Sequence, residues 1–172
     1  MLTMPTATPV EPSVHIAELH PLSSHVIGDV LMPPEARMRF VVPLFGLPEH
    51  HDYALLPAAR EGLWWLQALN DPGLAFLLAD PFTLDGSYVV DVGDVERDML
   101  RLEEASDALA LVMVTLPSGE ILDATANFRA PLVFNLRLGR GLQVVARNDA
   151  YSLRKPIELG TFPPQPNGLR MQ

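Results

Sequence analysis

Prolines and glycines divide the apolar parts of this 172-residue chain into short runs. The run in "PGLAFLLADP" lies between Pro72 and Pro81, and "YALLP" ends in proline. Runs this short, with breakers beside them, favour buried strands over helices, because helices need longer uninterrupted segments. This feature predicts a mainly β protein built from many short strands.

Alternation of apolar and polar residues strengthens that prediction. In "ARMRFVVPL" the even positions 38, 40, 42 and 44 are apolar, whereas Arg37 and Arg39 are polar, which is the period of a half-buried strand. "ALALVMVTL" ends at a Pro-Ser-Gly turn and returns through "EILDATANF" as a predicted hairpin. A second hairpin is predicted around a Gly-Arg-Gly turn. The apolar row before the turn is Leu132, Phe134, Leu136 and Leu138, and the row after it is Leu142, Val144 and Ala146.

One segment, "DVERDMLRLEEAS", has the period of a helix. Val95, Met99 and Leu102 fall at positions i, i+4 and i+7, and Asp94 is a candidate N-cap. We therefore expect one short amphipathic helix in an otherwise β fold.

Proline-rich ends set the expected domain boundaries. Residues 1–24 and 158–172 are predicted to be flexible tails, because their prolines cannot sustain a ladder of backbone hydrogen bonds. Residues 25–157 are long enough to bury a core of their own. The short strands and turns predict a small antiparallel β-barrel-like single domain, in which closure protects the strand edges.

The charge balance limits the partners of this domain. The formal net charge is -9, from 21 acidic and 12 basic residues, which disfavours direct binding to a nucleic-acid backbone. A basic protein partner is compatible with such a surface, although negative charge alone also serves solubility. With no cysteine in the chain, disulfides and thiolate chemistry are excluded.

The sequence pattern also contains no recognisable targeting signal. Residues 1–12 lack a basic segment followed by an apolar one, and no apolar run approaches the roughly 18 residues that cross a bilayer. We expect a cytoplasmic protein that does not contact the membrane.

Motifs for catalysis or metal binding are weak. His50 and His51 are adjacent and lie between Glu49 and Asp52, but neighbouring side chains on an extended chain point to opposite faces. No G-x-S-x-G elbow or phosphate-binding loop occurs. We therefore predict no enzyme activity, metal or cofactor. The alternative is a small-molecule-binding or metal-dependent β-barrel enzyme that uses these two histidines.

The stretch "TANFRAPLVFN", residues 125–135, carries polar residues at every second position before a proline. The even positions from 126 to 138 are apolar, which predicts one core-facing row across Pro131. Proline within a strand marks an edge position or a bulge, and a bulge would shift the register and reverse the faces.

Taken in order, these segments resemble the FliW family of flagellar assembly factors. The resemblance runs from about residue 26 to about residue 155. It rests on "VIGDVLMPPEARMRFVVPLFGLP", "GLWWLQALNDPGLAFLLADPF", "TANFRAPLVFN" and "GLQVVARNDAY". The chain departs from the family pattern at Glu49 and His50, where the family usually has Gly and Phe, and at Phe128, where Leu is commoner.

The resemblance implies a β-rich barrel without enzyme activity that binds two proteins in alternation. One is the translational repressor CsrA, a basic RNA-binding protein, and the other is newly made flagellin. Flagellin bound to the factor would leave CsrA free to repress flagellin translation. After flagellin secretion, the factor would capture CsrA and relieve that repression, and it would also act as a flagellin chaperone.

Eight residues are candidates for binding these partners. Acidic loop positions are expected to steer CsrA, and the others match the family pattern around the strands. The candidates are Asp71, Asp80, Asp85, Tyr88, Asn127, Arg129, Asn135 and Gln143. For Asn127, Arg129 and Asn135 the alternative is that the side chain satisfies backbone groups at a strand break.

Overall fold

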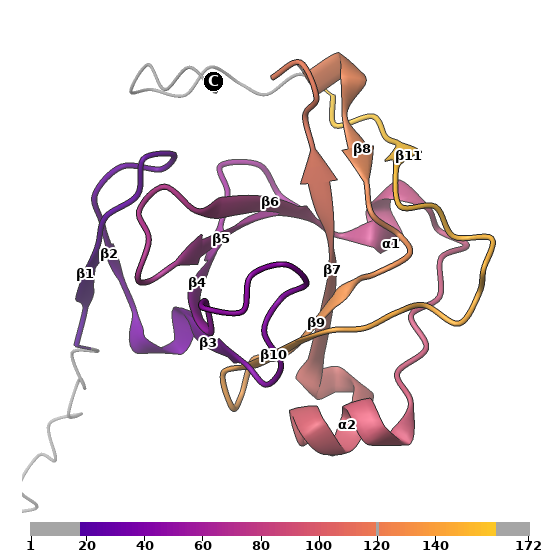
Figure 1. The fold of residues 1–172 in the computed structure, drawn as a ribbon, viewed down its shortest axis with the longest axis horizontal. Coiled ribbons are helices and arrows are strands. Elements are labelled where there is room, and N and C mark those ends of the chain that lie inside the picture. The colour runs from indigo at the N-terminus through magenta and orange to yellow at the C-terminus, as the bar shows by residue number, and fades with distance from the viewer. Residues whose placement is uncertain (1–17, 120, 161–172) are drawn as a thin grey trace, which may run out of the picture.

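The computed structural model describes residues 18–119 and 121–160, which form a mainly β protein (Figure 1). The strands are β1 His20–Leu22, β2 Val30–Met32, β3 Arg37–Phe40, β4 Asp52–Pro57, β5 Leu63–Ala68, β6 Ala75–Ala79, β7 Ala108–Thr115, β8 Thr125–Ala126, β9 Leu132–Asn135, β10 Arg140–Gln143 and β11 Lys155–Pro156. The helices are α1 Pro81–Leu84, α2 Asp94–Leu100 and the 3-10 turns η1 Pro34–Ala36, η2 Ala105–Asp107 and η3 Ile121–Asp123.

Seven of these strands close into a barrel, as the sequence predicted. The strand order is β7-β6-β5-β4-β3-β10-β9, and β9 pairs again with β7 to complete the ring. Within the ring every pair is antiparallel except β3 with β10, which is parallel. Figure 1 shows these strands as a ring, with the loop that follows β3 lying across it.

The barrel interior is filled by the side chains that alternate inward along each strand. Phe40 packs edge-on against Tyr53 at 5.2 Å and against Phe134 at 5.8 Å between ring centroids. Gly141 lies beside these rings, and a Cβ there would come within 3.1 Å of Phe40. Aliphatic residues complete this cluster, namely Met38, Leu44, Leu55, Leu66, Leu78, Leu111 and Leu132.

The outer face of the barrel is covered by the remaining elements. The hairpin of β1 and β2 covers one apolar cluster, and α2 packs on another that includes Val133 and Leu142. A larger outer cluster gathers Tyr88, Phe128 and Ile157 over β7 and β8. The side chains on one face of these strands therefore pack inside the barrel, and those on the other face pack in the outer clusters.

Two predicted inward rows end earlier than expected. Leu136 and Leu138 are 45% and 43% exposed, because β9 ends at Asn135 and the chain turns before β10. Val42 is 42% exposed for the same reason, since β3 ends at Phe40. Strand alternation constrains a side chain only as far as the strand continues.

The predicted helix is present, but its buried face was wrongly assigned. The helix begins at Asp94 after Gly93 as N-cap, and Val95 is 68% exposed whereas Leu100 is fully buried. Asn135 donates to the carbonyls of Leu100 and Arg101, so the helix is attached through its C-terminal end. A helix of seven residues is too short for a full apolar stripe to meet the barrel.

Strand pairing extends beyond the predicted domain boundaries. β1 begins at His20, inside the segment assigned to the N-terminal tail, because it pairs with β2 and buries Leu22. Leu159 is also buried, in the outer cluster around Phe128. Residues 1–17 and 161–172 of the two predicted tails lie outside the described residues.

Helices in the described part of the chain are all too short to cross a membrane.

The turn between β9 and β10 provides a test of barrel closure. Gly139 has a φ of 62°, and a Cβ there would lie 2.7 Å from the carbonyl oxygen of Arg37. Gly139→Ala should lower the free energy of unfolding by about 1–2 kcal/mol or more, measured by urea denaturation. Gly86→Ala is the control, because nothing lies within 4 Å of that position. Equal stability of the two variants would contradict this account of the turn.

Candidate functional site

A bulge interrupts the strand "TANFRAPLVFN" where it runs along β7. Ala126 is opposite Val114 and Leu132 is opposite Leu111, so six steps along one strand match three along the other. Three extra residues are therefore accommodated between β8 and β9. The expected bulge is present, and Pro131 lies at its end.

The bulge reverses the faces of the two half-strands, because an odd number of extra residues shifts a two-residue period. Ala126 and Phe128 pack into the outer cluster, whereas Leu132 and Phe134 fill the barrel interior. A single core-facing row across the proline is therefore wrong. Asn127 and Arg129, which lie within the bulge, line a pocket at the barrel opening.

Hydrogen bonds hold the bulge in one conformation. The hydroxyl of Tyr88 donates to the Phe128 carbonyl at 2.8 Å, and the two rings meet edge to face at 4.9 Å. The N–H groups of Phe128 and Arg129 both donate to the carbonyl of Ser152. Burial, with the neighbouring Tyr151, raises the pKa of Tyr88 to about 12, so the phenol remains a proton donor at neutral pH.

An ion pair closes the outer side of the bulge. Lys155 pairs with Asp85, and its ammonium lies 4.8 Å from the centre of the Phe128 ring. Hydrogen bonds from Lys155 and then from Ser87 lower the pKa of Asp85 to about 2. Asp85 is therefore a carboxylate at neutral pH, and its charge is matched by Lys155.

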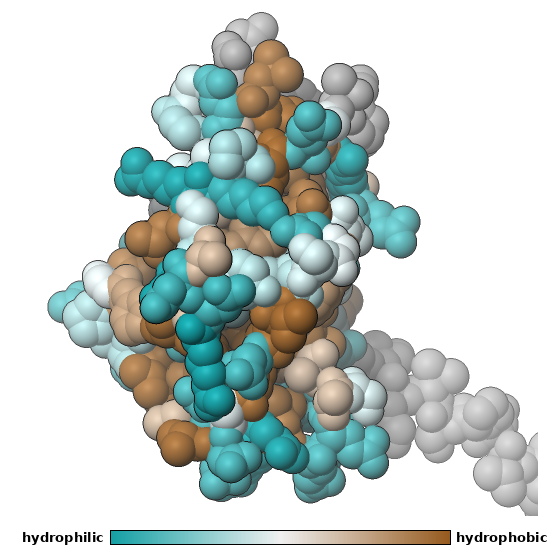
Figure 2. Space-filling model, turned by 90° about the vertical axis from the view of Figure 1, so that its right-hand side faces the viewer, coloured by the Kyte–Doolittle hydropathy of each residue, from teal (hydrophilic) through white to brown (hydrophobic). Residues whose placement is uncertain are grey.

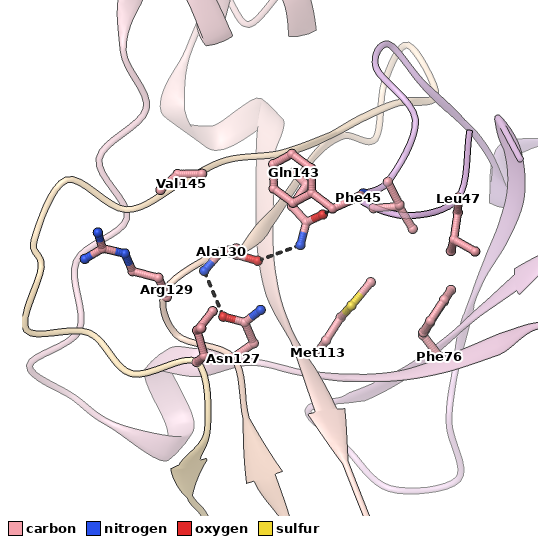
Figure 3. A pocket seen from close by; sticks show the side chains of 11 residues that line it. Phe45, Leu47, Phe76, Met113, Asn127, Arg129, Ala130, Gln143 and Val145 are labelled. Carbon is pink, nitrogen blue, oxygen red and sulfur yellow. Dashed lines mark hydrogen bonds between the residues drawn. The ribbon is translucent and has the colours of Figure 1, made fainter. Parts of the chain in front are cut away.

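A pocket of about 450 Å³ opens at the barrel mouth beside the bulge (Figure 3). Interior strands, the loop after β3, the bulge and the segment after β10 all contribute side chains. The lining residues are Leu44, Phe45, Leu47, Phe76, Met113, Asn127, Arg129, Ala130, Gln143, Val145 and Leu153. The volume lies within the range of known ligand pockets, and the lining is mostly apolar.

Two amide side chains organise the polar side of the pocket. Gln143 accepts a hydrogen bond from the Phe45 N–H and donates to the Ala130 carbonyl, both at 3.3 Å. The side-chain oxygen of Asn127 accepts from the Ala130 N–H at 2.9 Å. These bonds join the loop after β3 to the bulge, so the pocket is shaped before any partner arrives (Figure 3).

The rim of the pocket exposes large apolar side chains to water. Phe45 is 66% exposed, Leu153 is 62% and Val145 is 52%. Exposed apolar side chains gathered around one opening mark a surface where burial by a partner is favourable. On the face shown in Figure 2, hydrophobic side chains are interspersed with many hydrophilic ones.

Three of the eight candidate residues lie together in this pocket. They are Asn127, Arg129 and Gln143. The Arg129 guanidinium points away from the pocket, where it binds the Asn148 carbonyl and the Asp149 carboxylate.

The other five candidates lie elsewhere and bind their own surroundings. Asn135 is fully buried against α2, and Tyr88 is buried behind the bulge. Asp71 accepts from the Gly73 N–H in the turn between β5 and β6. Asp80 caps α1 by accepting from the Phe82 N–H, and Asp85 pairs with Lys155.

Sequence reasoning missed the apolar members of the pocket. Phe76 and Met113 belong to strands whose other inward side chains fill the interior, so their pattern is that of ordinary core residues. Phe45 alone carried a local signal, because a large aromatic residue in the Gly- and Pro-containing loop "PLFGLP" has no strand to bury it.

The histidines singled out by the sequence do not line this pocket. His50 forms a hydrogen bond through Nδ1 with the side-chain oxygen of Asn70 at 2.8 Å. Within residues 18–119 and 121–160, no three His, Cys, Asp or Glu side chains gather in a way that could hold a metal ion.

Comparison with known proteins identifies the family. A sequence model of the FliW protein matches residues 21–157, which is most of the chain. The chain belongs to the FliW family. The flagellar assembly factor FliW of Treponema denticola is 30% identical over 137 residues, covering 79% of this chain and 92% of that protein. That of Syntrophotalea carbinolica is 35% identical over 133 residues, covering 76% of this chain and 92% of that protein.

The fold agrees with a solved FliW structure. A crystal structure of the flagellar assembly factor FliW matches with a TM-score of 0.72 and 27% sequence identity. The match covers 80% of this chain and 96% of that chain, so it extends over nearly the whole of the known FliW chain.

The Tyr88 hydrogen bond can be tested by removing one hydroxyl. Tyr88→Phe leaves the buried Phe128 carbonyl unpaired and should lower the free energy of unfolding by about 1–3 kcal/mol in urea denaturation. Tyr53→Phe is a matched control in this FliW-family barrel, because the Tyr53 hydroxyl is buried and has no hydrogen-bond partner among the described residues. A stability loss as large in the control would show that the hydroxyl bond is not the cause.

The Asp85 ion pair predicts an acid-sensitive bulge. The folded pKa of about 2 lies below the ordinary 3.8, so the stabilisation is complete above about pH 4 and is lost as the pH falls toward 2. Asp85→Asn should be less stable than the unmodified protein at pH 7, and the difference should shrink through that window. Urea denaturation at a series of pH values measures it, and a constant difference would argue against the ion pair.

Proposed function

We propose that this chain is a flagellar assembly factor that binds flagellin and the repressor CsrA in alternation and catalyses no reaction. The observation that carries the proposal is its membership of the FliW family over residues 21–157. On this proposal the protein works in the cytoplasm, where flagellin is made. Neither a metal nor a cofactor has a part in it.

The proposed cycle couples flagellin translation to flagellin export. While unassembled flagellin is abundant, it occupies the factor, and free CsrA represses flagellin translation. When flagellin leaves the cell, the factor becomes available and captures CsrA, so translation resumes. While it is bound, flagellin is kept from associating prematurely with other flagellin subunits, and in this sense the factor is a chaperone.

The physical properties of the chain suit partners of these two kinds. Its formal net charge of -9 attracts a basic protein such as CsrA and repels RNA that competes for the same protein. The barrel-mouth pocket, with Phe45, Val145 and Leu153 exposed at its rim, suits an apolar surface such as an unassembled subunit presents.

Direct mixing tests the proposal. Purified protein should form a complex with CsrA and with flagellin from the same cell at micromolar concentrations, observed by size-exclusion chromatography and titration calorimetry. Flagellin added to the CsrA complex should displace CsrA. The absence of any complex with either protein would rule the proposal out.

Acidic steering of CsrA is tested by its dependence on salt. Asp71 and Asp80 each accept hydrogen bonds in their own turns, so replacing both by asparagine removes charge but keeps acceptor oxygens. Asp85 is left unchanged, because Lys155 already matches its charge and its replacement would weaken the bulge. Association with CsrA, measured by stopped-flow fluorescence, should be slower in the double variant and less sensitive to ionic strength. An unchanged rate and salt dependence would contradict steering by these residues.

A further inference from the structure

The barrel-mouth pocket contains an unused hydrogen-bond donor. Asn127 uses its side-chain oxygen to hold the Ala130 N–H, which fixes the amide orientation. Among the described residues no hydrogen-bond partner is found for its Nδ2, and in Figure 3 this nitrogen lies on the side of Met113. An amide donor fixed in an apolar pocket is suited to the carbonyl oxygen of an incoming chain.

Charge at the pocket is close to balanced. Among the residues that the structure describes, no Asp or Glu lines it, and the one charged lining residue, Arg129, is paired with Asp149. The overall negative charge of the protein is therefore carried elsewhere. A basic segment would find no partner for its charge here, so the lining favours an occupant that is apolar and uncharged.

We infer that the barrel mouth binds an apolar, uncharged segment of unassembled flagellin, with a large side chain inserted toward Phe76 and Met113. The backbone carbonyl beside that side chain accepts a hydrogen bond from Asn127 Nδ2. This inference rests on the proposed function and assigns one of its two partners to one site. The basic partner binds outside the pocket.

The construction of the pocket supports this mode of binding. Gln143 ties the loop after β3 to the bulge, and Tyr88 supports the bulge from behind, so little ordering is needed when a segment enters. Phe45, Val145 and Leu153 at the rim then lose exposed apolar surface to the neighbouring parts of the same segment.

Two substitutions separate the side-chain contact from the hydrogen bond. Val145→Glu places a charge at the apolar rim without altering the core, and should weaken flagellin binding about tenfold or more. Asn127→Asp keeps the oxygen that holds Ala130 but removes the donor, and should weaken flagellin binding about tenfold. Both are measured by titration calorimetry with full-length flagellin.

A matched control variant and a measurement of CsrA binding show whether the effect is specific to the pocket and to flagellin. Val95→Glu also adds a charge at an exposed valine, 68% accessible on α2 and away from the pocket, and should leave flagellin affinity unchanged. CsrA affinity should change less than about twofold in all three variants, because the pocket does not receive it. Thermal unfolding of each variant checks the fold, and Val145→Glu alone decides the matter if Asn127→Asp is unstable.

The possible failures are distinguishable. If the unmodified protein binds neither flagellin nor CsrA, the proposed function is wrong and this inference falls with it. If the unmodified protein binds both, but Val145→Glu binds flagellin as tightly, the proposed function stands and the pocket is not the flagellin site. If CsrA rather than flagellin loses affinity, the occupant has been wrongly assigned.

Discussion

The hydrogen bond from the Tyr88 hydroxyl to the Phe128 carbonyl supports the feature on which the rest of the structure depends. It holds a bulge of three extra residues between β8 and β9. Because that number is odd, one continuous stretch of chain contributes Phe128 to the outer cluster and Phe134 to the barrel interior. The same reversal brings Asn127 to the barrel mouth, so the bulge determines both the packing of this strand and the position of a pocket residue.

Closure of the barrel is the second constraint, and the pocket lies at an opening of the closed ring. β9 pairs with both β10 and β7, so the ring has no free edge between them. The interior is filled by packed rings around Phe40, and the apolar lining continues outward through Phe76 and Met113 to the exposed Phe45. The apolar lining of the mouth is thus continuous with the core, and on our proposal this continuity favours an apolar segment there.

Charge and apolar surface are separated in this protein, and the proposed partners differ in the same way. The acidic candidates Asp71, Asp80 and Asp85 lie in turns outside the pocket, where each also satisfies local backbone N–H groups. The pocket carries a balanced Arg129 and Asp149 pair. On our proposal the basic regulator CsrA and an apolar flagellin segment bind different parts of one small surface. The two proteins can then exclude each other only if their sites overlap or are coupled, because they do not contact the same residues.

The sequence by itself determined the class of fold, most of the strands and the family, because strand alternation, breaker residues and ordered motifs are local properties of the chain. It also indicated that Pro131 marks an edge position or a bulge, and three of the eight candidate residues, Asn127, Arg129 and Gln143, lie in the pocket. Only the tertiary structure decided the length of the bulge, since the register along β7 depends on residues far away in the chain. For the same reason Phe76 and Met113 could not be told from core residues, and Leu100 rather than Val95 is buried because Asn135 holds the end of α2.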